Sequence, residues 1–495
     1  MKNQIFPTIL LIILLISLSV IPAKAQNSSY TIIDLGTLGG SSSAVGAINE
    51  SGQVVGWSTT ASGATHAFLW ENGTMTDLGT LGGTESYAVD INDAGQVVGR
   101  STTASGDLHA FLWENGMMTG LGTLGGNESY AVDINDTGQV VGSSSIFYGS
   151  SPDHAFLWEN SAMTDLGALY SYPPYGNYGS SHAVAINNPG QVVGTSQTGG
   201  DQKDPFLWEN GVMIDLGNLG ERYDSFVADI NDQGQVVGTS IIFSDTEHAF
   251  LWQNGSMTDL GTLGDIYSIA SDVNGHGQVV GYSGTDLGET HAFLWENGTM
   301  IDLGTLGGSA SGASMINERG QIVGSSLVES GEEHAFLWQN GTMQDLGALQ
   351  GYCCSRAVAI NEQGDIIGSS QKDASEHATL WQVASEVSIT IDIKPGSTIN
   401  PINLQSKGVI PVAVLTTSEF DATTLDPSTV TFARTSALRW VQTDIDADGD
   451  VDLLFQFPVS KLNLMSTSTE ASLTGKTFAV VSVTGTDIVT IVPPR

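Results

Sequence analysis

The densest group of candidate metal ligands lies near the C-terminus, in residues 444–452, which read DIDADGDVD. Carboxylates stand at positions 1, 3, 5, 7 and 9 of this stretch and a glycine at position 6. This is the pattern of a calcium-binding loop, in which position 7 binds through its backbone carbonyl. The five aspartates are Asp444, Asp446, Asp448, Asp450 and Asp452. Because so many neighbouring carboxylates repel one another without a cation, we expect a structural calcium ion here.

The twelfth position of this loop is Phe455, where an EF-hand has a bidentate glutamate. The sequence therefore predicts one of the shorter aspartate loops of extracellular modules. A missing ligand would come from elsewhere in the chain, such as Asp392 or Asp426. The alternative is an acidic turn that holds no metal.

Histidines recur at one position of a repeated motif, HAFLW. Ligands of one ion must each lie about 2 Å from it, whereas equivalent residues of successive repeats are a repeat's width apart. We therefore expect each imidazole to form a hydrogen bond within its own repeat. The histidines are His66, His109, His154, His248, His291, His334 and His377. We expect a similar structural role for Asp90, Asp133, Asp229 and Asp272, which belong to a second motif, DIN and its variants.

Aromatic side chains gather in two long connections, residues 143–153 and 169–181. Exposed aromatic residues on variable loops over a rigid scaffold form a binding surface, here for sugars or an extended peptide. The alternative is that these side chains pack down as loop anchors. The predicted ligand-binding residues are Phe147, Tyr148, Tyr170, Tyr172, Tyr175 and Tyr178.

Signatures of catalysis are missing from the sequence, which has no serine nucleophile elbow, no HExxH and no phosphate loop. The only cysteines, Cys353 and Cys354, are adjacent, which rules out a framework of structural disulfides and leaves a redox switch as an alternative. We therefore predict that the protein is not an enzyme. A pair of acidic residues at working distance on a propeller is the competing hypothesis.

A sequence repeat positions these residues. Its pieces, seen in full from Ser86 to Gly122, recur eight times with a period of about 43 residues. Each copy has four short apolar runs, and turn residues such as Asp93 to Gly95 and Glu114 to Gly116 join the first to the second and the third to the fourth. This pattern predicts four antiparallel strands, as in a β-propeller blade.

The ends of the repeat region predict a closed ring. A lone strand, Tyr30 to Gly36, precedes the first repeat, and the eighth repeat stops after its third strand, His377 to Trp381. If the N-terminal strand fills this vacancy, eight blades close without a free sheet edge. The short turns then lie on one face of the ring and the variable aromatic connections on the other.

Residues 1–25 predict a signal peptide, with Lys2, an apolar stretch and a small-x-small cleavage site ending at Ala25. The apolar stretch is shorter than a membrane span needs, so an uncleaved anchor is the less favoured alternative. A formal net charge of −38 favours cations and repels nucleic acid and anionic lipid. We expect a secreted or cell-surface monomer with no transmembrane segment after cleavage and no nucleic-acid partner.

After the repeats, residues 383–388 read as a linker and 389–495 as a small β-sandwich that carries the aspartate loop. The expected strands are Ile389 to Ile393, Val409 to Leu415, Thr429 to Phe432, Val451 to Phe457, Thr477 to Val483 and Ile488 to Val492.

The tripeptide His-Ala-Phe before Leu-Trp, with DLGTLGG and IN-x-x-G-x-V-V-G, resembles the HAF-repeat family of secreted bacterial and archaeal proteins over residues 30–382. The resemblance implies an extracellular repeat protein and no particular reaction. The segments IDIKPGS and NPINLQSKGVIPVAVL resemble a C-terminal module of exported microbial proteins.

The sequence thus predicts an all-β protein, in which an eight-bladed propeller is closed by its N-terminal strand and followed by a calcium-stabilised sandwich. We expect binding at the variable face, with an extracellular carbohydrate or a surface protein as partner. The alternatives are a propeller lyase or hydrolase acting on extracellular polysaccharide, and a purely structural component of the cell envelope.

Overall fold

The computed structural model describes residues 30–147, 150–170, 179–199, 202–220, 224–243, 246–373, 375–383, 386–397, 399–418, 420–477 and 482–493. In this part of the chain the regular structure is β-strand and two short 3₁₀ turns, without an α-helix. The all-β prediction is therefore confirmed. Among these residues no helix is long and apolar enough to cross a bilayer. The expected signal peptide, residues 1–25, lies outside them.

Each copy of the repeat folds into an antiparallel sheet whose strands follow one another in sequence order. The first strands are β2 (Gly39–Ile48), β6 (Gly82–Ile91), β10 (Ser129–Ile134), β14 (Ser181–Ile186), β18 (Ser225–Ile230), β22 (Gly264–Val273), β26 (Gly307–Ile316) and β30 (Cys354–Ile360). The second strands are β3 (Val54–Thr60), β7 (Val97–Thr103), β11 (Val140–Phe147), β15 (Val192–Gly199), β19 (Val236–Phe243), β23 (Val279–Thr285), β27 (Ile322–Val328) and β31 (Ile366–Lys372).

The remaining two strands of each repeat lie farther from the axis. The third strands are β4 (Thr65–Glu71), β8 (Leu108–Glu114), β12 (Ser150–Glu159), β16 (Gln202–Glu209), β20 (Thr246–Gln253), β24 (Thr290–Glu296), β28 (Glu333–Gln339) and β32 (Ser375–Val383). The outer strands are β5 (Thr74–Asp77), β9 (Met117–Gly122), β13 (Ala162–Asp165), β17 (Val212–Asp215), β21 (Ser256–Asp259), β25 (Thr299–Asp302) and β29 (Thr342–Asp345). The strand β1 (Tyr30–Asp34) pairs with β32, with Ile32 opposite Trp381.

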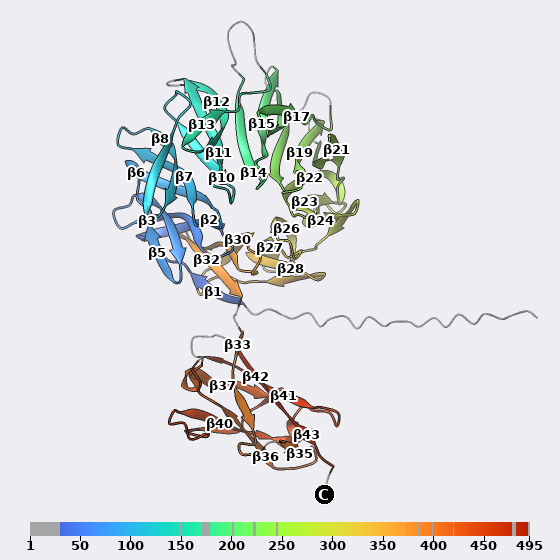
Figure 1. Cartoon of the computed structure of the whole chain (residues 1–495). Coiled ribbons are helices and arrows are strands. Elements are labelled where there is room, and N and C mark those ends of the chain that lie inside the picture. Colours follow the sequence, from blue (N-terminus) through green and yellow to red (C-terminus); the bar gives the residue numbers. More distant parts are fainter. Residues whose placement is uncertain are drawn as a thin grey trace, which may run out of the picture.

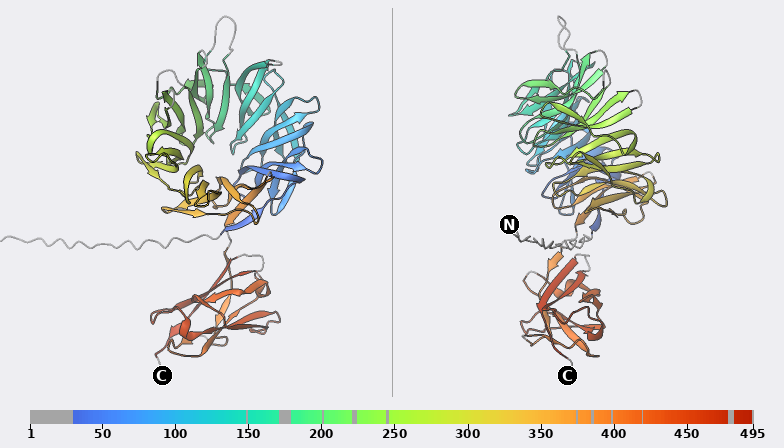
Figure 2. Two further views of the ribbon diagram at one scale, coloured as in Figure 1. Left: turned by 180° about the vertical axis from the view of Figure 1, so that it is seen from behind. Right: turned by 90° about the vertical axis from the view of Figure 1, so that its right-hand side faces the viewer.

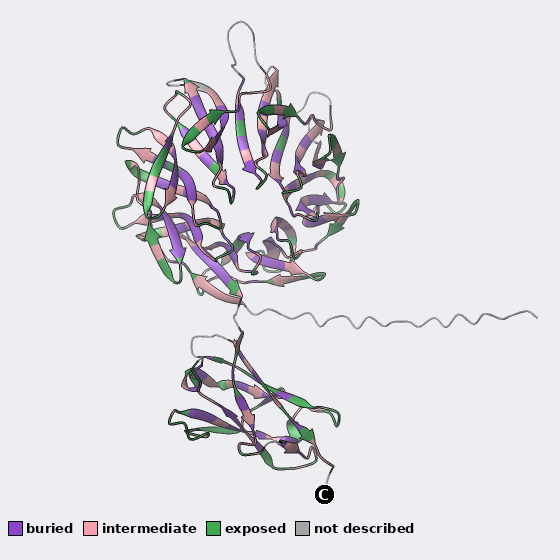
Figure 3. Ribbon diagram, viewed as in Figure 1, coloured by how far each residue is buried: buried purple, intermediate pink, exposed green. Residues whose placement is uncertain are grey.

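The sheets are arranged as a propeller-like ring, in which the last repeat lies beside the first (Figure 1). The view from behind shows the same ring (Figure 2). Apolar residues of neighbouring sheets form shared clusters, such as Val55, Ala67 and Leu69 with Val97 and Phe111. Burial is concentrated on the strands that face these interfaces (Figure 3). Because each middle strand is covered on both faces, its apolar residues form a continuous run and do not alternate with polar ones.

The turns follow the predicted chemistry. At the connection between β24 and β25, Asn297 and Gly298 have φ angles of 52° and 80°, the two positive values that a tight type I′ hairpin requires. At the connection between β6 and β7, the N–H of Gly95 donates to the carbonyl of Asn92 at 3.0 Å. These short turns fix which residues meet at one face of the ring.

The C-terminal residues form two main sheets of their own, ordered β33-β42-β41-β37-β38 and β34-β36-β40-β39, and a short pair β35-β43. Their strands are β33 (Glu386–Ser388), β34 (Ile391–Ile393), β35 (Pro401–Ile402), β36 (Val409–Val414), β37 (Leu425–Phe432), β38 (Thr435–Ser436), β39 (Arg439–Thr443), β40 (Asp452–Pro458), β41 (Glu470–Thr477), β42 (Ser482–Ile488) and β43 (Thr490–Ile491). The 3₁₀ turns are η1 (Ala422–Thr424) and η2 (Val459–Lys461). Phe432, Phe455 and Phe457 lie in the shared core.

Several expected boundaries differ from the structure. Residues 386–388 of the expected linker form β33, which pairs with β42. The expected long loop at 143–153 is mostly a strand hairpin, because β11 and β12 extend until Phe147 faces Ser150. The expected strand from Thr477 to Val483 corresponds to the end of β41 and the start of β42.

Candidate functional site

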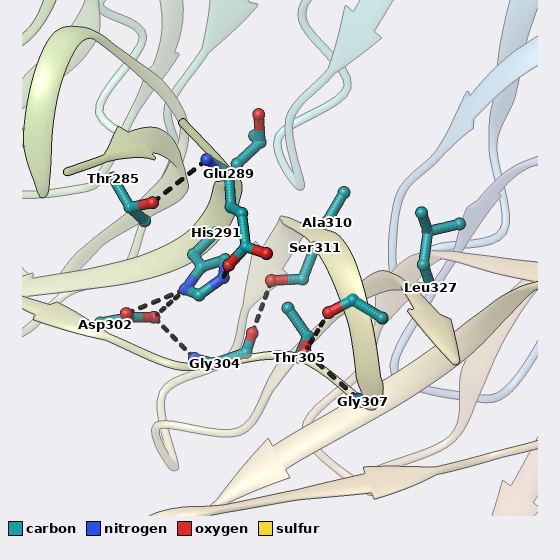
Figure 4. Close-up of polar contacts among 12 residues, drawn as sticks. Thr285, Glu289, His291, Asp302, Gly304, Thr305, Gly307, Ala310, Ser311 and Leu327 are labelled. Atoms are coloured by element: carbon teal, nitrogen blue, oxygen red, sulfur yellow. Dashed lines mark hydrogen bonds and ion pairs between the residues drawn. The ribbon is translucent and has the colours of Figure 1, made fainter. Parts of the chain in front are cut away.

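Six of the seven HAFLW histidines bond to an aspartate of the outer strand of their own sheet, whereas the outer strand beside His109 has Gly120 at that position. His291 on β24 has its Nδ1 atom 2.9 Å from both carboxylate oxygens of Asp302, the last residue of β25. Oδ1 of Asp302 also accepts the N–H of Gly304 at 2.7 Å (Figure 4). Contacts of 2.8–3.0 Å join the equivalent pairs His66–Asp77, His154–Asp165, His248–Asp259, His334–Asp345 and His377–Asp34. For these histidines the predicted structural hydrogen bond is confirmed, and its partner is an aspartate carboxylate on the outer strand.

An asparagine at the start of each first turn links neighbouring repeats. Nδ2 of Asn231 donates to Oε1 of Gln235 at 2.6 Å and to the carbonyl oxygen of Asn274 in the next repeat at 2.8 Å. The series of such links returns to its beginning, because Nδ2 of Asn361 donates to the carbonyl of Asn49 at 3.2 Å. The other links start from Asn49, Asn92, Asn135, Asn187, Asn274 and Asn317. We call this buried belt of side chains the asparagine belt.

A rim of acidic side chains follows the asparagine belt. The N–H of Glu50 donates to Oδ1 of Asp93 at 2.9 Å, and the N–H of Glu362 donates to both carboxylate oxygens of Glu50 at 3.1 Å. The carboxylate rim consists of Glu50, Asp93, Asp136, Asp232, Glu318 and Glu362. Partial burial, with the charges of Asp93 and Glu362, raises the pKa of Glu50. The rim therefore concentrates negative charge at one mouth of the ring.

Four aspartates of the first strands lie deeper along the axis, in two pairs. Burial raises the pKa of Asp133 well above its ordinary value, and the neighbouring carboxyl of Asp90 raises it further. Burial and the neighbouring Asp229 have the same effect on the pKa of Asp272. Each pair therefore favours a state in which one carboxyl is protonated and donates to the other. We call Asp90–Asp133 and Asp229–Asp272 the axial aspartate pairs.

A β-bulge in the first strand of these repeats changes the direction of the aspartate side chain. The pairing of β6 with β7 shifts register between Ala88 and Asp90, and the pairing of β10 with β11 does so between Ala131 and Asp133. Such a bulge changes the direction of the next side chain. Oδ2 of Asp133 then accepts the N–H of Ile186 in the following repeat at 2.7 Å. These aspartates therefore have a structural role, as expected: they accept backbone N–H groups of the neighbouring repeat, and they also line the axis.

Two hollows follow the axis. One of about 760 Å³ is lined by Asp90 and Asp133, by the carboxylate rim except Glu362, and by five residues of the asparagine belt, Asn49, Asn92, Asn135, Asn187 and Asn231. The second, of about 480 Å³, is lined by all four axial aspartates together with Val132 and Met315. Neither lysine nor arginine is among the residues described as lining these hollows. The first hollow opens on the face of the short turns, opposite the variable connections.

The predicted aromatic surface is only partly described. Phe147 ends β11 and is 49% exposed, and Tyr170 follows the fourth strand of the same repeat and is half-buried. The other predicted ligand-binding residues, Tyr148, Tyr172, Tyr175 and Tyr178, lie outside the described residues.

The aspartate loop brings its predicted ligands together between β39 and β40. Carboxylate oxygens of Asp444, Asp446 and Asp452 lie within 4.8 Å of one another, and so do those of Asp446, Asp448 and Asp450. Asp452 is fully buried, and its two carboxylate oxygens accept the N–H groups of Thr416 and Ile445 at 2.8 Å. These bonds hold the loop so that its carboxylates converge.

The donor set fits a hard divalent cation. Oδ1 of Asp450 is buried and has no hydrogen-bond partner among the described residues. Burial, with hydrogen bonding and repulsion from Asp448, raises the pKa of Asp450 to about 6. Converging carboxylates with an unsatisfied oxygen are the ligands that calcium prefers. Asp392 and Asp426 are not in either group: Asp426 accepts the N–H of Ser428 at 2.9 Å, and Asp392 lies near Asp487.

Comparisons with known proteins give structural likeness alone. No family model and no curated protein matches the chain. TolB from Acinetobacter baumannii is 12% identical with a TM-score of 0.31, and the match covers 58% of this chain and 80% of TolB. A puromycin-hydrolyzing peptidase from Mycobacterium tuberculosis is 11% identical with a TM-score of 0.37, covering 67% and 57%. A Trypanosoma rangeli sialidase is 10% identical with a TM-score of 0.29, covering 71% and 54%.

These neighbours correct the prediction that the protein is not an enzyme. The peptidase and the sialidase are both enzymes, so a ring of this general kind does not exclude catalysis. The chain spans less than two thirds of the length of either enzyme. At these identities and TM-scores the likeness transfers neither reaction to this chain.

Proposed function

We propose that the protein is an exported, eight-bladed β-propeller of the HAF-repeat kind, followed by a calcium-bearing β-sandwich. Closure of the ring is supported by the pairing of β1 with β32 and by the bond from Asn361 to Asn49. The repeated His-Ala-Phe and Asn-Gly elements support the family resemblance. The converging carboxylates of Asp444, Asp446 and Asp452 support the calcium site.

For its function, we propose that the axial channel binds an extracellular amino-sugar polymer through protonated amines. This proposal depends on one observation: two axial aspartate pairs line the channel beneath the carboxylate rim. A protonated amine entering the channel replaces the shared proton of a pair, because an opposite charge stabilises the ionised carboxyls. The rim attracts such a ligand at a distance and raises its local concentration.

The face of the ring that carries the variable aromatic connections has a second role in the proposed binding. Phe147 is exposed at the end of β11, on the side of the ring opposite the carboxylate rim. A sugar ring stacks on such an aromatic side chain. The six aromatic residues of the variable connections would then hold polymer segments outside the channel.

The test measures binding of glucosamine oligomers by calorimetry, with N-acetylglucosamine oligomers of equal length as the neutral comparison. We expect the amine form to bind and the neutral form to bind at least tenfold more weakly, with affinity falling as salt rises. Asp133→Asn should lose most of the amine preference. Asp107→Asn removes the same charge from the connection between β7 and β8, outside the channel, and should not change binding. Equal binding of both oligomers, or equal loss in the two variants, would contradict the proposal.

Hydrolysis of the same polymer is the second candidate. Hydrolysis of a glycosidic bond needs a protonated and an ionised carboxyl about 5–10 Å apart, and the two axial aspartate pairs on the wall of one hollow would supply one carboxyl each. In this case Asp90→Asn and Asp133→Asn would abolish the appearance of shorter oligomers in chromatography. Binding without product formation by the intact protein would exclude this candidate for these oligomers.

A further inference from the structure

Two adjacent thiols lie in the sheet that closes the ring, where Cys353 ends the connection before β30 and Cys354 begins this strand. The sulfur of Cys354 lies 2.8 Å from the sulfur of Cys353 and donates to it. Cys353 is exposed and Cys354 is half-buried. A disulfide bond needs the sulfurs at about 2.05 Å, so a small rotation of the side chains brings them to bonding distance.

The surroundings of the thiols connect them to the last sheet. The N–H of Cys353 donates to the carbonyl of Gln371 on β31 at 3.2 Å. The ring of the preceding residue, Tyr352, lies 5.4 Å from the imidazole of His377, centre to centre. His377 is the residue that pairs with Asp34 on β1 at 2.9 Å. A change in the backbone at residues 353 and 354 therefore reaches the strand that pairs with the N-terminus.

We propose that Cys353 and Cys354 form a reversible vicinal disulfide that loosens the pairing of β1 with β32. The oxidant is a low-molecular-mass disulfide. One cysteine thiolate attacks it, forming a mixed disulfide and releasing one small thiol. The second cysteine thiolate then attacks the mixed disulfide, releasing the second small thiol. Two protons leave the cysteines and protonate the released thiolates, and the two electrons reduce the small disulfide.

The geometry of adjacent residues makes this disulfide labile. Neighbouring Cα atoms are about 3.8 Å apart, closer than the roughly 4.4–6.8 Å of ordinary disulfides. The ring must therefore distort the backbone, and we expect the bond from Cys353 to Gln371 to weaken. Exposed and strained disulfides are the readily reduced ones. Contact with the Cys354 thiol and repulsion between two adjacent thiolates raise the pKa of Cys353, so the exchange should accelerate with rising pH.

The test treats the purified full-length protein with oxidised glutathione and measures intact mass and free thiols. We expect a monomer 2 Da lighter with no free thiol, and return to two free thiols after treatment with dithiothreitol. Persistence of both free thiols, a stable glutathione adduct or a disulfide-linked dimer as the main product would overturn the proposal.

Hydrogen exchange then tests the effect on the seam. In the oxidised protein we expect at least tenfold faster exchange in β1 and β32, and unchanged exchange in β22 and β23. Cys353→Ser and Cys354→Ser should each stop at the glutathione mixed disulfide, because no second thiol can displace it, and should show no change in the exchange of β1 and β32 while remaining folded. Oxidation that leaves exchange in β1 and β32 unchanged would refute the link between the thiols and the seam.

Discussion

The asparagine belt allows a direct test of ring closure through Asn361→Ala. The side chain of Asn361 is 2% exposed, donates to the carbonyl of Asn49 at 3.2 Å and accepts the N–H of Asp365 at 2.9 Å. Two buried hydrogen bonds contribute about 1 kcal/mol each, and the carbonyl left without a donor adds about 1–2 kcal/mol of lost stability. We therefore expect a loss of about 3–4 kcal/mol in the free energy of unfolding.

Urea unfolding followed by tryptophan fluorescence measures this loss, and hydrogen exchange locates it. Asn274→Ala is the matched control, because Nδ2 of Asn274 makes the same bond, at 3.2 Å, to Asn317 inside the ring. We expect faster exchange in β30 and β2 for Asn361→Ala and in β22 and β26 for the control. If the seam variant loses less than about 0.5 kcal/mol while the control loses several, the bond across the seam is not formed and the closure argument fails.

Three further predictions follow from the same contacts. Because the pKa of Asp133 is raised in the folded state, its contribution to stability is present near the ordinary carboxyl pKa and is lost as pH rises through the raised value. Asp133→Asn should therefore gain thermal stability relative to the wild type at pH 8 and not at pH 4, and an equal shift at both would contradict the pKa assignment. Phe293→Ala should cost about 3–5 kcal/mol in urea unfolding, since this side chain is fully buried between two sheets; a loss below 1 kcal/mol would argue against that interface. Calcium should raise the melting temperature of the protein, and Asp446→Asn should remove most of this shift because Asp446 belongs to both carboxylate groups; an unchanged shift would exclude the loop as the site.

The sequence predicted the sheets because the repeat contains its own turn chemistry. Asn-Gly pairs require positive φ at both positions, and Asn297 and Gly298 have it. The turns set where each apolar run begins and ends, so they also set the length and the order of the strands. By contrast, β39 was missed, since all residues from Arg439 to Thr443 are exposed and the segment has no buried face to give a pattern. The hairpin around Phe147 was expected as a loop because serine-rich residues are not typical of strands.

The axial site could not be predicted, because a bulge decides where its side chains point. In a regular strand, Ala88 and Asp90 lie on the same face, so the sequence pattern gives no reason to place Asp90 on the axis. The register shift between these residues redirects Asp90 toward the axis. The sequence contains one hint of the axial site: the position two residues before the belt asparagine is aspartate in only some repeats and alanine or methionine in others. The corresponding residues elsewhere are Ala47, Ala185, Met315 and Ala359.

The position of the acidic residues, more than their number, determines what they do in this protein. Aspartates on the outer strands, such as Asp302, lie against a histidine of the same sheet, so their charge has a local partner. On the axis the nearest comparable contact is His276 with Glu318, at 3.1 Å on the rim. The axial aspartate pairs have each other as neighbours, and burial together with this proximity raises the pKa of Asp133 and Asp272. An incoming cation therefore gains the most electrostatic stabilisation at these pairs. The proposed function depends on them for this reason.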